Sequence, residues 1–353
     1  MGAHEILVGA SLSLSGTFRL QGEQALNGLG LWADHVAGEG RIQPRVLALD
    51  DRSRASLAKE NVLRLLTHER VDCLIGPYSS GLTLAVAPLA EAHQKILWNH
   101  GGASDAISQH GWRHLVSVPS PAGDYFRSLP LWVKRRDPEA RRIAILYGKA
   151  GSFAGQVAQG AAESARAAGF DLIRLTAFDS PSRNAPALFD EALEPVPDVL
   201  VGVGSFQDDI AMVRRRELLA GVKSLAVVAA GLAAFQRELG DLAEGVIGPS
   251  QWEPGSPEVP LLGPDSAWFC SAFRRRFHQD PEYPAAQAFA VGVIFTECLR
   301  RAGSLEDESL LRAAHALETT TLYGRFRLDP VTSRQIGHGM LLVQWRDGRK
   351  QIL

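Results

Sequence analysis

The strongest constraint on the fold is an alternation of short apolar segments with helical patterns, which begins near residue 6 and starts again near residue 142. The first series predicts elements that lie, in chain order, at residues 6–10 (strand), 22–36 (helix), 46–49 (strand), 55–67 (helix), 71–75 (strand), 80–92 (helix), 96–98 (strand) and 115–118 (strand). Apolar strands that alternate with helices are typical of a parallel sheet covered on both faces. The first third of the chain is therefore predicted to be a doubly wound α/β unit.

The second series has a similar length and the same pattern. Its predicted elements lie at residues 142–146 (strand), 153–168 (helix), 171–176 (strand), 184–193 (helix), 199–203 (strand), 208–219 (helix), 225–229 (strand), 233–239 (helix) and 245–247 (strand). The remainder is mostly helical, with helices at 265–278, 284–301 and 308–317 before a last strand at 340–345. A chain of 353 residues with two such series is expected to form two domains.

Three segments that carry proline or glycine separate these series, and we interpret them as crossovers between two lobes. They are Val118–Gly123, Gly248–Pro254 and Tyr323–Pro330. The expected lobes are residues 1–119 plus 252–325 and residues 120–251 plus 326–353, with a ligand cleft between them. Because a chain that crosses three times makes a multi-strand hinge, this arrangement suits a clamp that closes on a ligand.

Composition removes several classes of function. The formal net charge is −2, with acidic and basic residues interleaved, so no basic field indicates nucleic-acid binding. The three cysteines, Cys73, Cys270 and Cys298, are expected to be buried free thiols. Neither a membrane-spanning stretch nor a signal-peptide pattern is present. The chain therefore either acts in the cytoplasm or represents a mature sequence whose export signal is removed.

Small polar residues cluster in three loops that follow predicted strands, where open α/β sheets bind their ligands. The loops are Ser11–Gly16, Gly76–Gly81 and Asn99–Asp105. In the second loop, Ser79 or Ser80 can cap the following helix, whose free N–H groups and dipole favour an anion. A plain helix cap explains the same residues, and on pattern alone it is the favoured explanation.

Enzyme signatures fail in their context. Gly28–Ala33 fits a dinucleotide-binding fingerprint literally but lies inside a helical pattern. We find no nucleophile elbow or phosphate loop. His110 and His114 are expected to be surface or capping residues, and Asp50 and Asp51 to be capping, solvated carboxylates. The sequence thus predicts no catalysis, no cofactor and no metal.

A series of short matches makes the chain recognisable, and it covers nearly the whole sequence. The matches are Ile6–Gly16, Gly22, Asn27–Gly28, Leu49–Asp51, Cys73–Gly76, Ser79–Ser80, Gly101–Ser104, Arg142–Leu146, Asp198–Val201, Ala243–Gly245 and Leu341–Trp345. In this order and spacing the sequence resembles the branched-chain amino-acid-binding family of periplasmic solute-binding proteins. The resemblance implies the type I periplasmic-binding-protein fold, with two doubly wound parallel-sheet lobes, and delivery of solutes to ABC importers.

The resemblance also implies roles for individual residues. Ser80 and Ser104 would hold a ligand carboxylate through hydroxyl and backbone N–H groups, and the Gly102 carbonyl would accept from a ligand ammonium. The second lobe would supply an aromatic ring at Phe153 and further contacts at Ser205 and Phe206, while Gln21 would lie at the pocket mouth. The candidate aromatic lining is Tyr78, Trp98, Phe153, Phe206 and Trp252.

The sequence departs from the family in two places. Members specific for α-amino acids have a second-lobe glutamate that pairs with the ligand ammonium, whereas Ala230 or Gly231 falls there in this chain. The family disulfide is absent as well, since its two positions are Ser53 and Ser79. Without the glutamate, an aromatic or branched aliphatic carboxylate, with or without an amino group, is expected to bind at least as well as leucine. The alternative is that Glu253, Asp208 or Asp105 replaces the glutamate and amino-acid specificity remains.

The expected function is capture of a small carboxylate solute by hinge closure. The expected partners are that ligand and, transiently, a membrane ABC permease, and the chain is expected to act as a monomer outside the cytoplasm. One alternative is a cytoplasmic ligand-sensing regulator on the same fold. A second is an enzyme on a flavodoxin-like scaffold, which would need a general base or metal that the sequence does not show.

Overall fold

The computed structural model describes residues 4–40, 42–181 and 194–353. The chain divides into two compact units, and each is described by itself. Unit 1 consists of Met1–Ser120 and Pro254–Gly339, and unit 2 consists of Pro121–Glu253 and Met340–Leu353. Each unit is therefore formed by two separate stretches of the chain, and the C-terminal residues Met340–Leu353 belong to unit 2.

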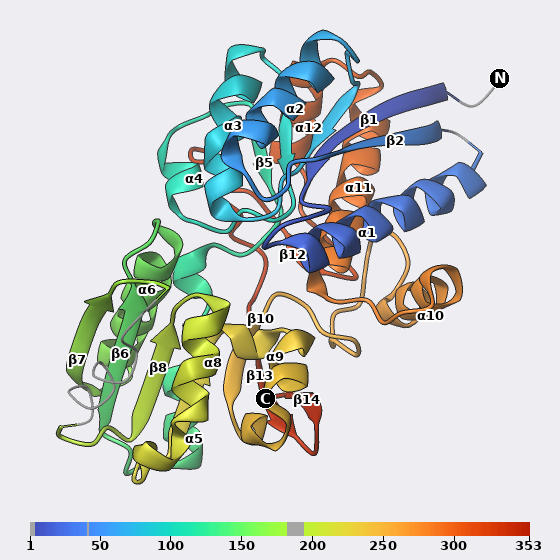
Figure 1. Ribbon diagram of the computed structural model, residues 1–353. Coiled ribbons are helices and arrows are strands. Elements are labelled where there is room, and N and C mark those ends of the chain that lie inside the picture. The colour runs from blue at the N-terminus through green and yellow to red at the C-terminus, as the bar shows by residue number, and fades with distance from the viewer. Residues whose placement is uncertain (1–3, 41, 182–193) are drawn as a thin grey trace. The chain divides into compact units, whose positions relative to one another are not determined.

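Unit 1 is built on a parallel sheet of five strands in the order β2-β1-β3-β4-β5 (Figure 1). The strands are β1 (His4–Leu12), β2 (Ile42–Asp50), β3 (Cys73–Ile75), β4 (Leu97–Asn99) and β5 (Leu115–Ser117). Its helices are α1 (Arg19–Gly38), α2 (Ala55–Thr67), α3 (Ser80–Ala92), the short α4 (Ala106–Gln109), α10 (Ser266–Phe277), α11 (Tyr283–Ala302) and α12 (Asp307–His315). A two-stranded hairpin of β11 (Thr319–Thr321) and β12 (Gly324–Phe326) completes it.

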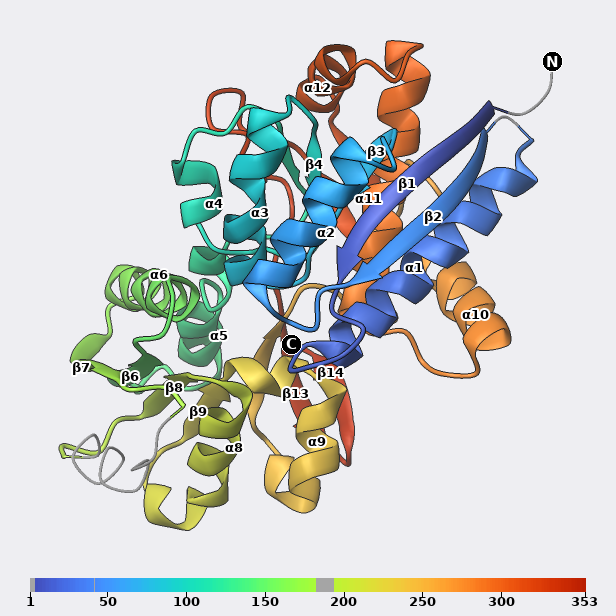
Figure 2. The ribbon, with the colours of Figure 1, turned by 45° about the horizontal axis from the view of Figure 1, so that its top comes forward.

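Both faces of this sheet are covered, as the apolar strands require. Leu97 of β4 belongs to a buried cluster with residues of α2 and α3. The next residue, Trp98, points to the opposite face, where its ring packs edge-on against Phe295 of α11 at 5.5 Å. Helices α1 and α11 lie side by side (Figures 1 and 2).

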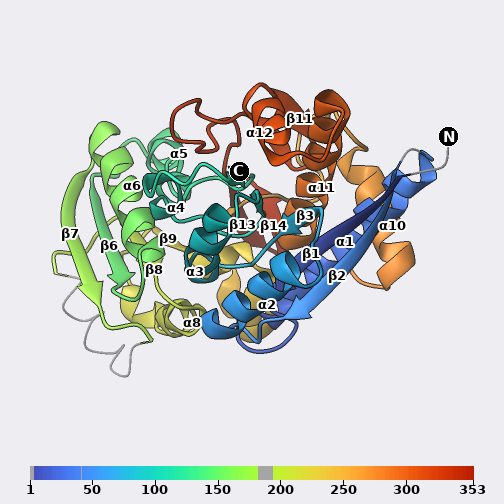
Figure 3. The same cartoon turned by 90° about the horizontal axis from the view of Figure 1, so that it is seen from above.

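Unit 2 contains a seven-stranded sheet in the order β14-β13-β10-β9-β8-β6-β7, with β7 at one edge (Figure 3). The strands are β6 (Arg142–Gly148), β7 (Asp171–Phe178), β8 (Val199–Val203), β9 (Ser224–Val227), β10 (Ile247–Ser250), β13 (Leu341–Arg346) and β14 (Arg349–Ile352). The main helices are α5 (Leu129–Arg136), α6 (Phe153–Ala167), α8 (Phe206–Arg214) and α9 (Ala233–Leu239), with a 3₁₀ turn, η3 (Val228–Gly231), directly after β9. Strands β6 to β10 pair in parallel, and β13 and β14 pair antiparallel.

The alternation along β6 separates two cores in unit 2. Ile143 and Ile145 lie in the cluster that includes α5 and α6, whereas Ala144 and Leu146 lie in the cluster that includes α8 and α9. The prediction of α/β units with parallel, doubly covered sheets is therefore confirmed. The predicted helix at 184–193 lies outside the described residues.

Several element boundaries differ from the predictions. The predicted strand at 225–229 ends at Val227, and η3 begins at Val228. The predicted helix at 208–219 begins at Phe206 and ends at Arg214. Helix α5 and strand β14 were not predicted, because one follows a proline-rich segment and the other has the polar sequence Arg-Lys-Gln-Ile. All three cysteines are buried and free, as predicted.

The third crossover lies at 339/340, not near 325/326 as expected. Residues 326–339 are tied to unit 1 by specific hydrogen bonds. The side-chain amide of Gln335 donates to the Val118 carbonyl at 3.1 Å, and the Ser120 hydroxyl lies 2.6 Å from Nδ1 of His338. These distant pairings could not be read from the local pattern of proline and glycine. Within the described residues, no helix has the length and apolarity needed to cross a membrane.

Candidate ligand site

The N-terminus of α3 is the first part of the candidate site. Ser79 has a φ of 83° and caps the helix, its hydroxyl accepting from the Leu82 N–H at 3.4 Å. The preceding turn needs Gly76, whose φ is 124° and where a Cβ would lie 2.6 Å from the Ser11 carbonyl oxygen. No acidic residue lies in the first turn of α3. The positive end of this helix dipole therefore has no carboxylate of its own helix to neutralise it.

The structure brings Ser80 and Ser104 together. The Ser80 hydroxyl oxygen accepts from the backbone N–H groups of Ser104 at 2.9 Å and of Ala103 at 3.2 Å. The Ser104 hydroxyl in turn accepts from the Ala106 N–H at 3.3 Å. Because Ser80 uses its oxygen as the acceptor in both bonds, its hydrogen can still be donated, and a carboxylate oxygen can accept it.

Asn99 organises the loop between these serines, and sequence reasoning gave it no role. It is fully buried at the end of β4, and its Oδ1 accepts from the N–H groups of Gly101 at 3.2 Å and Gly102 at 2.7 Å. Its Nδ2 donates to the Gly102 carbonyl at 2.7 Å. The carbonyl that was expected to serve a ligand ammonium is thus already held by Asn99.

An aromatic group adjoins the loop. Tyr78 pairs with Gly101 in an isolated bridge, and a Cβ on Gly101 would lie 2.8 Å from the Tyr78 ring. The Tyr78 hydroxyl contacts the Tyr283 hydroxyl on α11, and its ring lies 5.8 Å from that of Phe18. Burial raises the pKa of Tyr78 to about 12. Phe18 and Tyr283 were missed because they come from elements distant in sequence.

The remaining unit 1 candidates differ in exposure. Gln21, in the first turn of α1, is half-buried, and its buried side-chain oxygen has no hydrogen-bond partner among the described residues. Trp98, expected to line a pocket, is 1% exposed and packs against Phe295, so it belongs to the core of unit 1. That expectation was wrong because a buried parallel strand places alternate residues in both cores.

The first polar loop is held by the adjacent carboxylates. Asp51 is completely buried and accepts from the hydroxyls of Ser13 at 2.5 Å and Ser11 at 3.3 Å. Asp50 accepts from the Leu14 N–H at 3.0 Å and the Ser15 hydroxyl at 2.7 Å. The prediction that both are solvated caps was therefore wrong for Asp51, and both tie the Ser11–Gly16 loop to β2.

In unit 2, the expected contact residues lie at the starts of two helices. Phe153, the first residue of α6, packs edge-on against Tyr125 at 5.1 Å. Phe206, the first residue of α8, packs partly buried against the α8 and α9 core. Ser205 caps α8 in a capping box, accepting from the Asp208 N–H at 3.2 Å, while the Asp208 carboxylate accepts from the Ser205 N–H at 2.9 Å.

Family comparisons identify the chain. A model of the periplasmic binding protein family matches residues 5–350. The chain belongs to the periplasmic binding protein family. The recognition made from the sequence is confirmed, and as a member of this family the chain is a solute-binding protein.

Relatives and solved structures agree with this membership. The Leu/Ile/Val-binding protein homolog 8 of Brucella abortus (strain 2308) is 24% identical over 369 residues, which cover 98% of this chain and 89% of the relative. The branched-chain amino acid transporter substrate binding protein LivJ of Streptococcus pneumoniae, in complex with isoleucine, has a TM-score of 0.83 at 17% identity, covering 99% of each chain. A solute binding protein of an ABC transporter from R. palustris, in complex with benzoate, has a TM-score of 0.81 at 18% identity, covering 100% of this chain and 96% of that chain. The type I fold is thereby confirmed.

In this binding protein, the position expected for an ammonium-binding glutamate cannot carry one without rearrangement. A Cβ on Gly231 would lie 2.1 Å from the Pro249 carbonyl oxygen. Ala230 is fully buried in the α8 and α9 core, and its carbonyl accepts from the Trp345 indole at 2.8 Å. At these two positions the η3 turn therefore offers backbone groups and no acidic side chain.

The three carboxylates that could replace the glutamate already have partners. Glu253 pairs with Lys350, and Asp105 lies 3.0 Å from the Arg334 guanidinium. Asp208 accepts from the hydroxyls of Ser180 at 2.5 Å and Ser205 at 2.7 Å. An ammonium ligand would have to compete with these groups.

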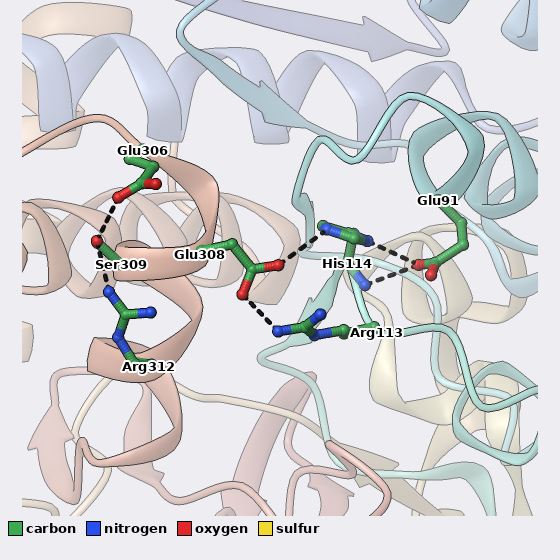
Figure 4. A network of polar contacts seen from close by, with 7 residues as sticks. All are labelled: Glu91, Arg113, His114, Glu306, Glu308, Ser309 and Arg312. Carbon is green, nitrogen blue, oxygen red and sulfur yellow. Dashed lines mark hydrogen bonds and ion pairs between the residues drawn. The ribbon is translucent and has the colours of Figure 1, made fainter.

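The two histidines considered for a metal site lie in different surroundings. His114 is buried beside Glu91, whose carboxylate lies 3.2 Å from Nδ1, while Nε2 lies 3.8 Å from Glu308 (Figure 4). The ring of His110 stacks on Trp112. Within the described residues, no group of three or more His, Cys, Asp or Glu side chains is placed to hold a metal ion. The contacts of His114 join β5 to α3 and α12.

Proposed function

We propose that this protein captures a small carboxylate outside the cytoplasm and delivers it to a membrane ABC permease. The observation that carries the proposal is the pairing of Ser80 with Ser104 at a helix N-terminus that lacks acidic residues. A hydroxyl donor and a helix dipole at one point form a favourable environment for a carboxylate. In the proposed mechanism, ligand contacts with both units stabilise a closed state, with Phe153, Ser205 and Phe206 contributing from unit 2.

We further propose that the ligand needs no α-amino group. The absence of an acidic side chain at Ala230 and Gly231 supports this, as does the engagement of Glu253, Asp105 and Asp208 by other groups. A buried ammonium without a partner is costly, so an amino acid gains little here over its deaminated analogue. The bound ligands named for similar structures include both isoleucine and benzoate.

Matched ligand pairs test both parts of the proposal. Calorimetric titrations would compare leucine with 4-methyl-2-oxopentanoate, and phenylalanine with phenylpyruvate and benzoate. We expect at least one amino-free acid to bind as well as its amino-acid partner. Binding of the amino acids alone would contradict the ligand class, and failure of every carboxylate to bind would contradict the function.

A further inference from the structure

Asp209 is a buried carboxylate of unit 2 that the proposed ligand contacts do not use. It lies in the first turn of α8 with an exposed fraction of 1%. Its Oδ1 accepts from the Gly204 N–H at 3.0 Å, and its Oδ2 accepts from the Ala229 N–H at 2.8 Å. One carboxylate thus joins the segment after β8 to the η3 turn after β9.

One joined segment leads directly into the proposed contact positions of unit 2, and the other leads into the η3 positions where the expected glutamate is absent. Ser205 and Phe206 follow Gly204, and Ala230 and Gly231 follow Ala229. The carbonyl side of η3 is held separately, by the Trp345 indole on Ala230 and by Lys350 on the Gly231 carbonyl at 3.0 Å. Asp209 therefore fixes the spacing of the two segments through their amides.

The ionisation state of Asp209 decides whether both bonds can exist. An ionised carboxylate accepts with both oxygens, whereas a protonated carboxyl carries a hydrogen on one of them. Since both oxygens face N–H groups, protonation opposes one bond. Burial raises the pKa of Asp209 to about 7, and the negative charge of the neighbouring Asp208 adds to this rise. The hydrogen bonds from the Ala229 and Gly204 amides lower the pKa but do not cancel the effect of burial.

Apart from Asp208, several charged groups on the elements around Asp209 have partners of their own. On α8 and α9, Arg214 pairs with Glu238. Arg216 donates to the Glu244 carbonyl. Lys350 and Glu253 pair at Gly231, the other end of η3. Glu217, Arg237 and Asp241, on α9 and on the 3₁₀ turns that follow α8 and α9, are exposed at the surface.

We propose that Asp209 is a positioning residue. Its ionised form holds the segment after β8 and the η3 turn in the positions needed for ligand binding, so that proton uptake by Asp209 weakens the affinity for the ligand. This inference rests on the proposed function and adds a pH-dependent control to the same site. Loss of one charged hydrogen bond predicts an affinity about tenfold weaker at low pH.

The test is calorimetry from about pH 5.5 to about pH 8.5, with benzoate or 4-methyl-2-oxopentanoate as the probe, whichever binds more tightly. A carboxylate with a pKa of about 4 stays ionised over this range, so the ligand itself does not titrate. We expect wild-type affinity to fall about tenfold toward low pH, with a midpoint near the pKa of Asp209. Asp209→Asn should bind at the low-pH level throughout, with a flat profile. An unchanged wild-type profile in Asp209→Asn would overturn the inference.

A second variant and a ligand-free measurement keep the inference testable if Asp209→Asn folds poorly. Asp208→Asn removes the adjacent negative charge, so the midpoint should move to lower pH. In the wild-type protein without ligand, the NMR signals of the Gly204 and Ala229 amides should shift together with one midpoint. If those amides titrate while affinity stays flat, the inference is wrong and the proposed function is unaffected. If no carboxylate binds but the amides titrate, the proposed function is wrong. The link that Asp209 makes between the two segments would still stand.

Discussion

The N-termini of α3 in unit 1 and α8 in unit 2 are both capped by a serine, but only the first turn of α8 carries negatively charged side chains. Each helix follows a buried strand and has a serine cap, Ser79 or Ser205. In α8 the first turn contains Asp208 and Asp209, and the capping box uses the helix's own carboxylate. In α3 the first turn contains no acid, and the Ser80 hydroxyl hydrogen can still be donated. A helix end that supplies its own anion disfavours another, so the carboxylate of a ligand is expected at α3.

The largest effect on affinity is expected from removing the hydroxyls of Ser80, at the N-terminus of α3, and of Ser104, in the loop beside it. Ser80→Ala combined with Ser104→Ala removes two hydrogen bonds to a charged group, each worth about 1.5–3 kcal/mol. Affinity for the tightest carboxylate should fall about a hundredfold or more by calorimetry. Asp265→Ala is the control, since it removes the cap of α10, whose side chain accepts from the Trp268 N–H at 2.7 Å. It should lower stability without changing affinity, and a matching loss of affinity in the control would show a nonspecific effect.

The next effect concerns the stability of the protein at Gly231 in the η3 turn, where there is no room for a side chain. Gly231→Ala places a methyl group against the Pro249 carbonyl and should lower the free energy of unfolding by about 3 kcal/mol, measured by urea denaturation. Gly38→Ala is the matched change at the end of α1, where no described atom outside the local helix lies within 4 Å of the added Cβ. It should leave stability unchanged or raise it by up to about 1 kcal/mol. Equal stabilities of the two variants would disprove the close packing of η3.

A third change would make α3 resemble α8. Gly81 is exposed, and no atom of the described residues outside the local helix lies within 4 Å of a Cβ built there. Gly81→Asp adds a negative charge to the first turn, and repulsion of a ligand carboxylate by about 2 kcal/mol should weaken binding roughly thirtyfold. Gly81→Asn has nearly the same shape without the charge and should bind much more tightly than the aspartate variant. The charge explanation fails if the two variants bind equally.

The smallest effect is expected at the cap of α8. Ser205→Ala removes the capping hydroxyl and should cost about 1 kcal/mol of stability, seen in thermal melting. Because that hydroxyl already serves Asp208, affinity should change by less than about threefold. A tenfold loss would instead show that the Ser205 hydroxyl itself hydrogen-bonds to the ligand.

Local patterns were sufficient to predict most of the fold. Buried parallel strands appear in the sequence as short apolar runs, and helix α3 was predicted from Ser80 to Ala92, as observed. Strand β14 was missed because an edge hairpin can consist of polar residues such as Arg349 and Lys350. The third crossover was misplaced because Gln335 and His338 bind residues more than two hundred positions away.

The candidate site was predictable only where its residues follow strand ends. Ser80 and Ser104 were noted because they lie in polar loops that follow parallel strands, and the resemblance to the binding-protein family implied their role. Tyr283 and Asp209 gave no such signal, and Asn99 was placed in the third polar loop without a role, because their roles depend on hydrogen bonds to the backbone or on a partner from a distant helix. Asp51 was misjudged for the same reason, since only the folded chain brings Ser11 and Ser13 to it.

The most direct test of the carboxylate site is an NMR titration of the wild-type protein with benzoate and, separately, with benzamide. The amide analogue has almost the same shape but no negative charge. We expect benzoate to shift the backbone amide signals of Ser80, Gly81 and Ser104 more than those of Ser205 and Asp208, and benzamide to shift none of them appreciably. Largest shifts at Ser205 and Asp208, or equal responses to both compounds, would contradict a carboxylate held at the N-terminus of α3.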